Sequence, residues 1–316
     1  MTPARMRAPV LDGAPCLLHD YPVPEPGNGE VRVRVRRAGI CNTDLEILRG
    51  YQNFSGVIGH EFVGETEDGR RVVGEINTHC GECGPCSRGD LTHCDRRTAL
   101  GIHGRDGALA DFLLLPVENL HEVPDAVTDR QAVFVEPLAA AVGIIDRIHV
   151  RPSDRVLVAG DGKLGLLVAQ VLQLTGCDLV ALGHHPDKLS ILERRGIRTL
   201  LGPPGDYRQY DIVVECTGKP EGFDLALRQV RPRGTIVCKS TFHGPQEVAL
   251  SPLVVSEVTV VGSRCGPFRP ALRLLEQHLV DVDSMVTAEY MMEECEQALR
   301  RAAQPGSLKV QVVMRS

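Results

Sequence analysis

The stretch VLVAGDGKLGLLVAQ constrains the fold of this 316-residue chain more than any other. It spaces three glycines as G-x-G-x-x-G, directly after an apolar strand pattern and at the start of a helical one. Such a turn lets backbone approach a pyrophosphate at a helix N-terminus. The stretch predicts a dinucleotide site, and the alternative is a tight turn without a ligand. The predicted cofactor contacts at the turn and at the end of a later strand-like segment are Gly160, Gly162, Lys163, Leu164, Gly165 and Thr217.

The rest of the chain divides by its hydrophobic pattern. Before about residue 128, period-2 alternation at 30–36 and strand-like segments at 69–76 and 110–116 predict a small antiparallel barrel or sandwich. From there on, helical segments alternate with continuous apolar strands, which predicts a parallel sheet covered on both faces. The predicted strands of this sheet lie at 155–160, 177–183, 210–218, 234–240 and 257–263. Two helices and a terminal strand at 309–314 follow.

The end of the strand at 177–183 bears on the choice of dinucleotide. An acid commonly binds the ribose 2′-hydroxyl there, but this chain has Gly183, and Asp187 comes four residues later. Without an acid a 2′-phosphate is not repelled, and His184, His185 and Lys188 can donate to it. The sequence therefore favours NADP over NAD. The alternative is that the histidines are solvated loop residues.

Four cysteines lie within fifteen residues in the spacing C-x2-C-x2-C-x7-C. Four thiolates around one zinc ion make a closed tetrahedral site without an open position for chemistry. The eleven cysteines are odd in number and accompany no export signal, so we expect metal ligands rather than disulfides. The predicted ligands of this structural zinc are Cys80, Cys83, Cys86 and Cys94.

Composition excludes several classes of partner. A net charge of −6 and a cysteine loop without a basic or aromatic face argue against nucleic acid. No apolar run approaches the roughly 20 residues that span a bilayer, and residues 1–10 have no apolar signal region. We expect a cytoplasmic protein without a membrane segment.

A second metal site has four candidate ligands, which are Cys41, His60, Glu61 and Glu136. A thiolate, an imidazole and one or two carboxylates suit zinc, with water or a substrate oxygen completing the shell. Each residue also has an ordinary alternative, as a small buried side chain, a core histidine or an acid at a helix start. Their spacing does not show that they meet.

Five motifs occur in one order: GxCNTD from residue 39, GHEFVGE from 59, the cysteine loop, FVEPLAAAV from 134 and GDGKLG from 160. In this order the chain resembles the zinc-dependent medium-chain dehydrogenases, which include alcohol, polyol and threonine dehydrogenases. The resemblance implies an α/β fold with a GroES-like β-barrel catalytic domain and a Rossmann doubly wound parallel sheet. The implied boundaries are 1–127 for the catalytic domain with its structural zinc loop at 80–94, 128–266 for the Rossmann domain, and 267–316 for a C-terminal segment that returns to the catalytic domain.

The resemblance also implies roles for residues. Cys41 and His60 correspond to ligands of a catalytic zinc, whose shell Glu61, Glu136 or water completes. Thr43 corresponds to the hydroxyl that touches the substrate alcohol, with Asp44 in a supporting place. Glu46 stands where many relatives have a proton-relay histidine.

The implied activity is hydride transfer between an alcohol or carbonyl, secondary or polyol in type, and NAD(P), with two zinc ions per chain. The implied assembly is a homodimer or homotetramer. A zinc- and dinucleotide-binding redox sensor or assembly protein without turnover is the alternative. Lys239 is expected either as a cofactor contact or as a structural group.

Overall fold

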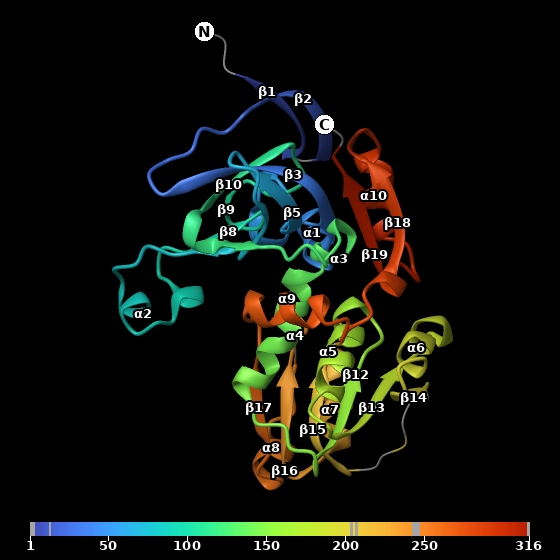
Figure 1. Ribbon diagram of the computed structural model, residues 1–316. Coiled ribbons are helices and arrows are strands. Elements are labelled where there is room, and N and C mark those ends of the chain that lie inside the picture. Colours follow the sequence, from blue (N-terminus) through green and yellow to red (C-terminus); the bar gives the residue numbers. More distant parts are fainter. Residues whose placement is uncertain (1–3, 13, 203–204, 206–207, 242–246, 315–316) are drawn as a thin grey trace. The chain divides into compact units, whose positions relative to one another are not determined.

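The computed structural model describes residues 4–12, 14–202, 205, 208–241 and 247–314. These fall into two units, one formed by Met1–Glu136 with Ala271–Ser316 and the other by Pro137–Pro270. Figure 1 shows the course of the chain through each. Helices α4 (Val135–Arg147) and α9 (Phe268–Glu276) lie where the chain passes from one unit to the other. In the described part of the chain, no helix is long and apolar enough to cross a membrane.

The unit Pro137–Pro270 is built on a six-stranded parallel sheet. Its order is β14-β13-β12-β15-β16-β17, which is the 3-2-1-4-5-6 order of the Rossmann fold. The parallel sheet predicted from the sequence is therefore confirmed. The strands are β12 (Arg155–Ala159), β13 (Asp178–Gly183), β14 (Arg198–Leu201), β15 (Tyr210–Glu215), β16 (Val230–Cys238) and β17 (Thr259–Gly262).

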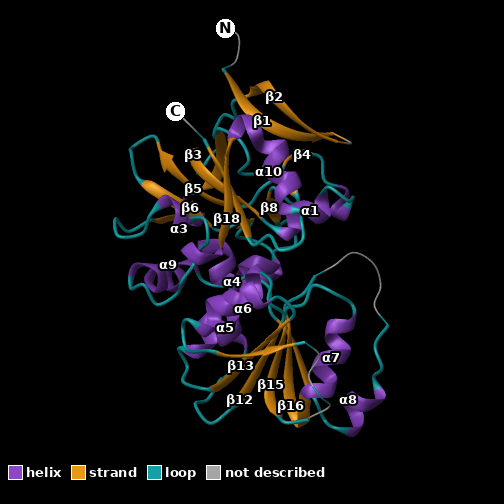
Figure 2. Cartoon of the chain, turned by 90° about the vertical axis from the view of Figure 1, so that its right-hand side faces the viewer, coloured by secondary structure: helices purple, strands orange, loops and turns teal. Residues whose placement is uncertain are grey.

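Helices cover both faces of this sheet, as Figure 2 shows with α5 and α6 on one side and α7 and α8 on the other. The middle residues of the central strands are apolar because both faces of the sheet are covered there. Leu157 and Val213, on neighbouring strands, are fully buried. The helices are α5 (Lys163–Gln173), α6 (Pro186–Glu193), α7 (Glu221–Gln229) and α8 (Ser251–Val255).

The other unit is mainly antiparallel. Its largest sheet runs β11-β6-β5-β3-β19-β18, with β10 also paired to β3, and two three-stranded sheets have the orders β2-β1-β4 and β7-β8-β9. The strands are β1 (Arg5–Asp12), β2 (Ala14–Pro22), β3 (Glu30–Ile40), β4 (Gly56–Val57), β5 (Glu61–Thr66), β6 (Arg71–Gly74), β7 (Asn77–Thr78), β8 (Thr98–Leu100), β9 (Gly104–Arg105), β10 (Phe112–Pro116), β11 (Leu120–Glu122), β18 (Val286–Met291) and β19 (Lys309–Val313).

Short helices connect these strands. The α-helices of this unit are α1 (Asn42–Ile47), α2 (Gly84–Ser87), α3 (Asp129–Ala132) and α10 (Cys295–Ala302). Single 3-10 turns lie at Tyr51–Asn53, Leu91–His93, Val117–Asn119, Asp283–Met285 and Met292–Glu294. Strand β19 pairs antiparallel with β3, so residues 309–313 lie in the same sheet as residues 30–40.

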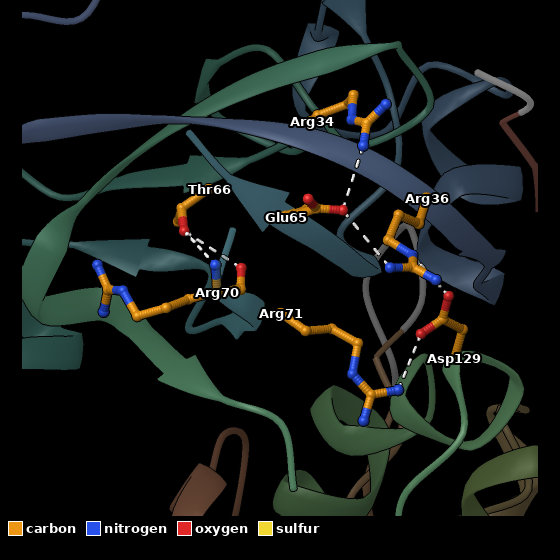
Figure 3. Close-up of polar contacts among 7 residues, drawn as sticks. All are labelled: Arg34, Arg36, Glu65, Thr66, Arg70, Arg71 and Asp129. Carbon is orange, nitrogen blue, oxygen red and sulfur yellow. Dashed lines mark hydrogen bonds and ion pairs between the residues drawn. The ribbon is translucent and has the colours of Figure 1, made fainter. Parts of the chain in front are cut away.

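Strand β3 has the two faces that its alternating sequence predicts. Val33 and Val35 are buried, whereas Arg34 and Arg36 point to the other side. Figure 3 shows both arginines reaching Glu65 on β5, and Arg36 also reaching Asp129 on α3. Charged groups therefore cover the outer face of the sheet while its inner face packs into the core.

Candidate active site

The loop at 80–94 brings its four cysteine sulfurs together. The Sγ–Sγ distances are 3.4 Å for Cys83–Cys86, 3.5 Å for Cys80–Cys94, 3.7 Å for Cys83–Cys94 and 4.0 Å for Cys80–Cys86. Zinc–thiolate bonds of ~2.3 Å in a tetrahedron would set the sulfurs about 3.8 Å apart. The four donors therefore already have the spacing of a tetrahedral zinc site.

The surroundings of these sulfurs favour thiolates unequally. Backbone N–H groups, that of Glu82 first, lower the pKa of Cys80 to about 6. Burial raises the pKa of Cys86 to about 11. Four sulfurs this close cannot all carry charge without a cation among them, and a bound zinc ion supplies that charge.

The second group consists of Cys41, His60 and Glu61, whose ligand atoms all lie within 4.8 Å of one another. Cys41 directly precedes α1, and Glu61 is the first residue of β5. His60 follows Gly59, which has a φ of +98° and a Cα so close to Leu109 that a Cβ would lie 2.8 Å from the backbone nitrogen of Leu109. His60 and Glu61 are buried, while Cys41 is partly exposed. The group is thus reachable at its thiol.

Asp44 on α1 connects two members of this group. Its Oδ2 accepts a hydrogen bond from the backbone N–H of Cys41 at 2.7 Å, and its Oδ1 accepts one from the N–H of Gly59 at 3.2 Å. The Nδ1 atom of His60 lies 3.1 Å from Oδ1. Because Asp44 is fully buried, its carboxylate has no competing water and fixes the backbone at Cys41 and Gly59, which places the His60 ring beside it.

The electrostatics of the group favour a positive charge. Burial by itself lowers the pKa of His60, but the Asp44 carboxylate and then the Cys41 thiol raise it well above its ordinary value. The same negative groups that favour a proton on His60 also favour a metal cation in its place.

The two carboxylate oxygens of Glu61 have different surroundings. One oxygen, Oε2, is paired with the ammonium of Lys309 on β19, and both side chains are almost completely buried. The ammonium also lies 5.4 Å from the centre of the Phe134 ring. The other oxygen, Oε1, is buried and has no hydrogen-bond partner in the described structure. A buried carboxylate oxygen without a partner, next to a thiol and an imidazole, fits a missing cation.

Gly39 makes room for this pair. It lies opposite Glu61 in the β3–β5 ladder, and a Cβ there would lie 2.5 Å from Oε2 of Glu61 and 2.6 Å from Val133. A residue with a side chain at position 39 would therefore displace Glu61.

Three further residues predicted for this site take the following places. The Thr43 hydroxyl lies 3.8 Å from the Cys41 sulfur, at the edge of the group. Glu46, on the next turn of α1, is paired with Arg49. Glu136 is half-buried at the start of α4, and its carboxylate is not among the three donors that meet.

The glycine-rich turn has the geometry that its spacing predicts. Gly160 has a φ of +124°, and a Cβ there would lie 2.5 Å from the carbonyl oxygen of Cys216. A Cβ at Gly165 would lie 2.0 Å from the carbonyl oxygen of Gly160. Gly162 precedes α5 and faces open space. The first and third glycines thus serve packing, and the second leaves room for a ligand next to the helix N-terminus.

The remaining predicted cofactor residues cluster around the ends of β13 and β15. His184 and His185 are exposed and Lys188 is partly exposed. The hydroxyl and backbone N–H of Thr217 both donate to Oε1 of Glu215, at 2.6 and 2.7 Å. Lys239 is buried and donates to the carbonyl oxygens of Ala140 and Arg264, so it has the structural role that was one of its two expectations.

Three functional candidates were missed in the sequence. They are Lys309, which pairs with Glu61, Glu215, which holds Thr217, and Asp161, whose carboxylate lies against Gly183. Glu215 is a buried acid that directly follows the apolar run Ile212–Val214 of β15, and this was the signal for it. Asp161 lies between two glycines of the motif, while Lys309 carried no local signal.

Two units, one with a four-thiol site and a Cys–His–Glu group and the other with a Rossmann sheet, define the class of zinc-binding dehydrogenases. Residues 27–125 match the family model described as Alcohol dehydrogenase GroES-like domain, and residues 164–277 match the one described as Zinc-binding dehydrogenase. The chain belongs to the zinc-dependent medium-chain dehydrogenase family, as its resemblance implied.

Individual relatives agree with this placement. The chain is 28% identical over 323 residues to the sorbitol dehydrogenase of Halalkalibacterium halodurans, covering 93% of this chain and 94% of that one. It is 29% identical over 365 residues to the erythritol/L-threitol dehydrogenase of Mycolicibacterium smegmatis, covering 98% of both.

Two solved structures are similar over nearly the whole chain. A short chain alcohol dehydrogenase of Escherichia coli CFT073, complexed with NADH, has a TM-score of 0.88 and 25% identity, covering 98% of this chain and 99% of that one. A putative zinc-binding dehydrogenase of Sinorhizobium meliloti 1021, bound to NADP, has a TM-score of 0.87 and 27% identity with the same coverage. The two structures hold different dinucleotides.

Proposed function

We propose that this chain is an NAD(P)-dependent zinc dehydrogenase that interconverts a secondary or polyol alcohol and its carbonyl compound. The observation that carries the proposal is the meeting of Cys41, His60 and Glu61 around a point where one buried oxygen of Glu61 has no partner. A thiolate, an imidazole and a carboxylate would fill three of the four positions around a zinc ion. The fourth position would stay open, as it does in catalytic zinc sites. The four cysteines at 80–94 would hold a second, structural zinc ion.

Within the catalytic group, Glu61 rather than Glu136 is the carboxylate we assign to the metal. Its Oε1 is the unpartnered atom, and its Oε2 stays on Lys309. Because Nδ1 of His60 faces Asp44, we assign Nε2 to the metal. Asp44 therefore orients two ligands without binding the ion.

The chain's own residues then handle the proton of the alcohol. Bound zinc supplies Lewis-acid chemistry that lowers the pKa of an alcohol, and the nicotinamide accepts its hydride. Thr43 lies beside Cys41 and takes the hydroxyl proton from the substrate. As it does so, Thr43 gives up its own hydroxyl proton, and Glu46, one helical turn further and paired with Arg49, or the cofactor ribose passes that proton outward.

The substrate class follows from the relatives rather than from the site. The two relatives named above are dehydrogenases of sorbitol and of erythritol or threitol, which are uncharged polyols. We assign a small polyol or a related secondary alcohol to this chain on that likeness.

We also propose that copies of this chain associate, as homodimer or homotetramer, along β17. This strand is an edge of the parallel sheet. Its residues Thr259–Gly262 carry no charge to prevent pairing with another strand. Just before it, Val254 and Val255 on α8 are 76% and 84% exposed. Apolar surface beside an open edge supports a second copy as the partner.

The proposed function is tested by initial rates of NAD⁺ and NADP⁺ reduction against a panel of polyols and secondary alcohols. We expect turnover by the wild-type chain with at least one of them, and none by His60→Ala, because the zinc would lose a ligand. Thr92→Ala, on a partly exposed residue of the cysteine loop that is not a ligand, serves as the matched control and should keep wild-type rates. A folded, zinc-loaded chain that binds dinucleotide but transfers no hydride from any alcohol of the panel to NAD⁺ or NADP⁺ would support the sensor instead.

A further inference from the structure

The carboxylate of Asp161 lies at the end of β13, where dinucleotide-binding folds commonly have an acid that binds the ribose. Asp161 belongs to the glycine-rich turn after β12, yet its side chain reaches across to the end of β13. An ideal Cβ built on Gly183 would lie 2.5 Å from Oδ2 of Asp161 and 2.6 Å from its Cβ. Position 183 therefore has to be glycine, because any side chain there would collide with Asp161.

The same carboxylate also accepts hydrogen bonds from the backbone N–H groups that follow β13. The N–H groups of His184 and His185 each donate to Oδ2 of Asp161 at 2.7 Å. The Nδ1 atom of His185 lies 3.0 Å from Oδ2 and 3.1 Å from Oδ1. The donors that could have received a 2′-phosphate are thus already satisfied by an acid of the chain itself.

Asp161 is charged at neutral pH. Burial by itself raises its pKa, but the backbone N–H and ring of His185 and the backbone N–H of His184 outweigh this and lower it. Oδ1 contacts only a ring nitrogen among the described contacts and, as a carboxylate oxygen, has a lone pair left for a hydroxyl donor. The turn thus presents negative charge and an acceptor at the place of the adenosine ribose.

We propose that Asp161 takes the role of the missing strand-end acid, accepts a hydrogen bond from the ribose 2′-hydroxyl, and makes this chain select NAD over NADP. A 2′-phosphate would meet its charge at close range and would find the N–H groups of His184 and His185 taken. This reverses the preference for NADP that the absence of an acid at position 183 suggested. The inference rests on the proposed dinucleotide-binding function and names its cofactor.

The test is calorimetric titration of the full-length chain with NADH and with NADPH, which needs no alcohol substrate. We expect wild type to bind NADH at least about tenfold more tightly than NADPH. Asp161→Asn keeps the size and an acceptor oxygen but removes the charge, and the preference should fall about tenfold. Asp161→Ala also frees the two N–H groups, so NADPH should gain further.

The matched control is Asp187→Asn. It removes an acid from the first turn of α6, four residues after Gly183, and should leave the ratio of the two affinities unchanged. If wild type binds NADPH more tightly, or if Asp161→Asn leaves the ratio of the NADH and NADPH affinities unaltered, the role assigned to Asp161 is wrong. Either result would leave the proposed function standing. Wild type that binds neither dinucleotide would contradict the proposed function itself, and the assignment with it.

Discussion

Among single residues, Lys309 contacts a candidate ligand of the zinc site without being a candidate ligand itself. Its ammonium holds one oxygen of Glu61 and leaves the other for a metal. In β19, Lys309 and Gln311 alternate with Val310 and Val312, a pattern typical of a strand with one solvent-exposed face. The structure buries all four residues. Their partners come from distant segments, so no local pattern could reveal the pair.

Lys309→Met should destabilise the chain by about 3–5 kcal/mol, because it leaves the buried carboxylate of Glu61 without its cation. Guanidinium unfolding of the zinc-stripped chain measures this. The double variant Lys309→Met with Glu61→Met removes both charges and should recover most of the loss. An equal loss in the double variant would mean that packing around Lys309, rather than charge, is responsible.

Glu46 is the residue whose role depends most on the resemblance to relatives. If it carries the proton outward, Glu46→Gln should lower kcat by about 10- to 100-fold and change the pH dependence of the rate. Arg49→Gln is the control, because it removes the ion pair but keeps the carboxylate. A pH–rate profile of Glu46→Gln that matches wild type would assign the proton route to the cofactor ribose.

The elements of the chain were predictable to the extent that their patterns are local. The alternation in β3, the apolar strands β12, β13, β15 and β16, and the cysteine spacing each lie within one short segment, and the predictions from them agree with the structure. Strand β14 was not predicted, because its four residues are mostly exposed and carry no apolar run. The group of Cys41, His60 and Glu61 needs two separate elements to meet, which spacing alone could not establish.

The contact between the turn after β12 and the end of β13 has a testable pH dependence. Because the pKa of Asp161 is lowered in the folded chain, its contribution to stability is present above the unfolded pKa of about 3.9 and is lost as pH falls through the folded value. Asp161→Asn should therefore cost about 1–2 kcal/mol at pH 7 and less at pH 3. Urea unfolding at both pH values measures the difference. An equal cost at both would show that shape, not charge, holds the turn.

At the scale of the whole molecule, the edges of the parallel sheet bear on assembly. Val260 on β17 is 44% exposed, and Leu201 on the opposite edge strand β14 is 62% exposed. If copies pair along β17, Val260→Lys should shift the chain toward the monomer in sedimentation velocity, because a buried unpaired ammonium at an interface is costly. Leu201→Lys is the matched control and should not change the sedimentation coefficient. If Leu201→Lys gives the monomer and Val260→Lys does not, the interface lies at β14 instead of β17.

The whole account depends on two metal sites of different kind, one closed by four thiolates and one left open by Cys41, His60 and Glu61. Zinc per chain, measured by mass spectrometry on purified wild type and on His60→Ala, tests this most directly. We predict two zinc ions in wild type and one in His60→Ala, with the ion at the cysteine loop retained. A single zinc ion in both proteins would contradict the open site, and with it the proposed dehydrogenase.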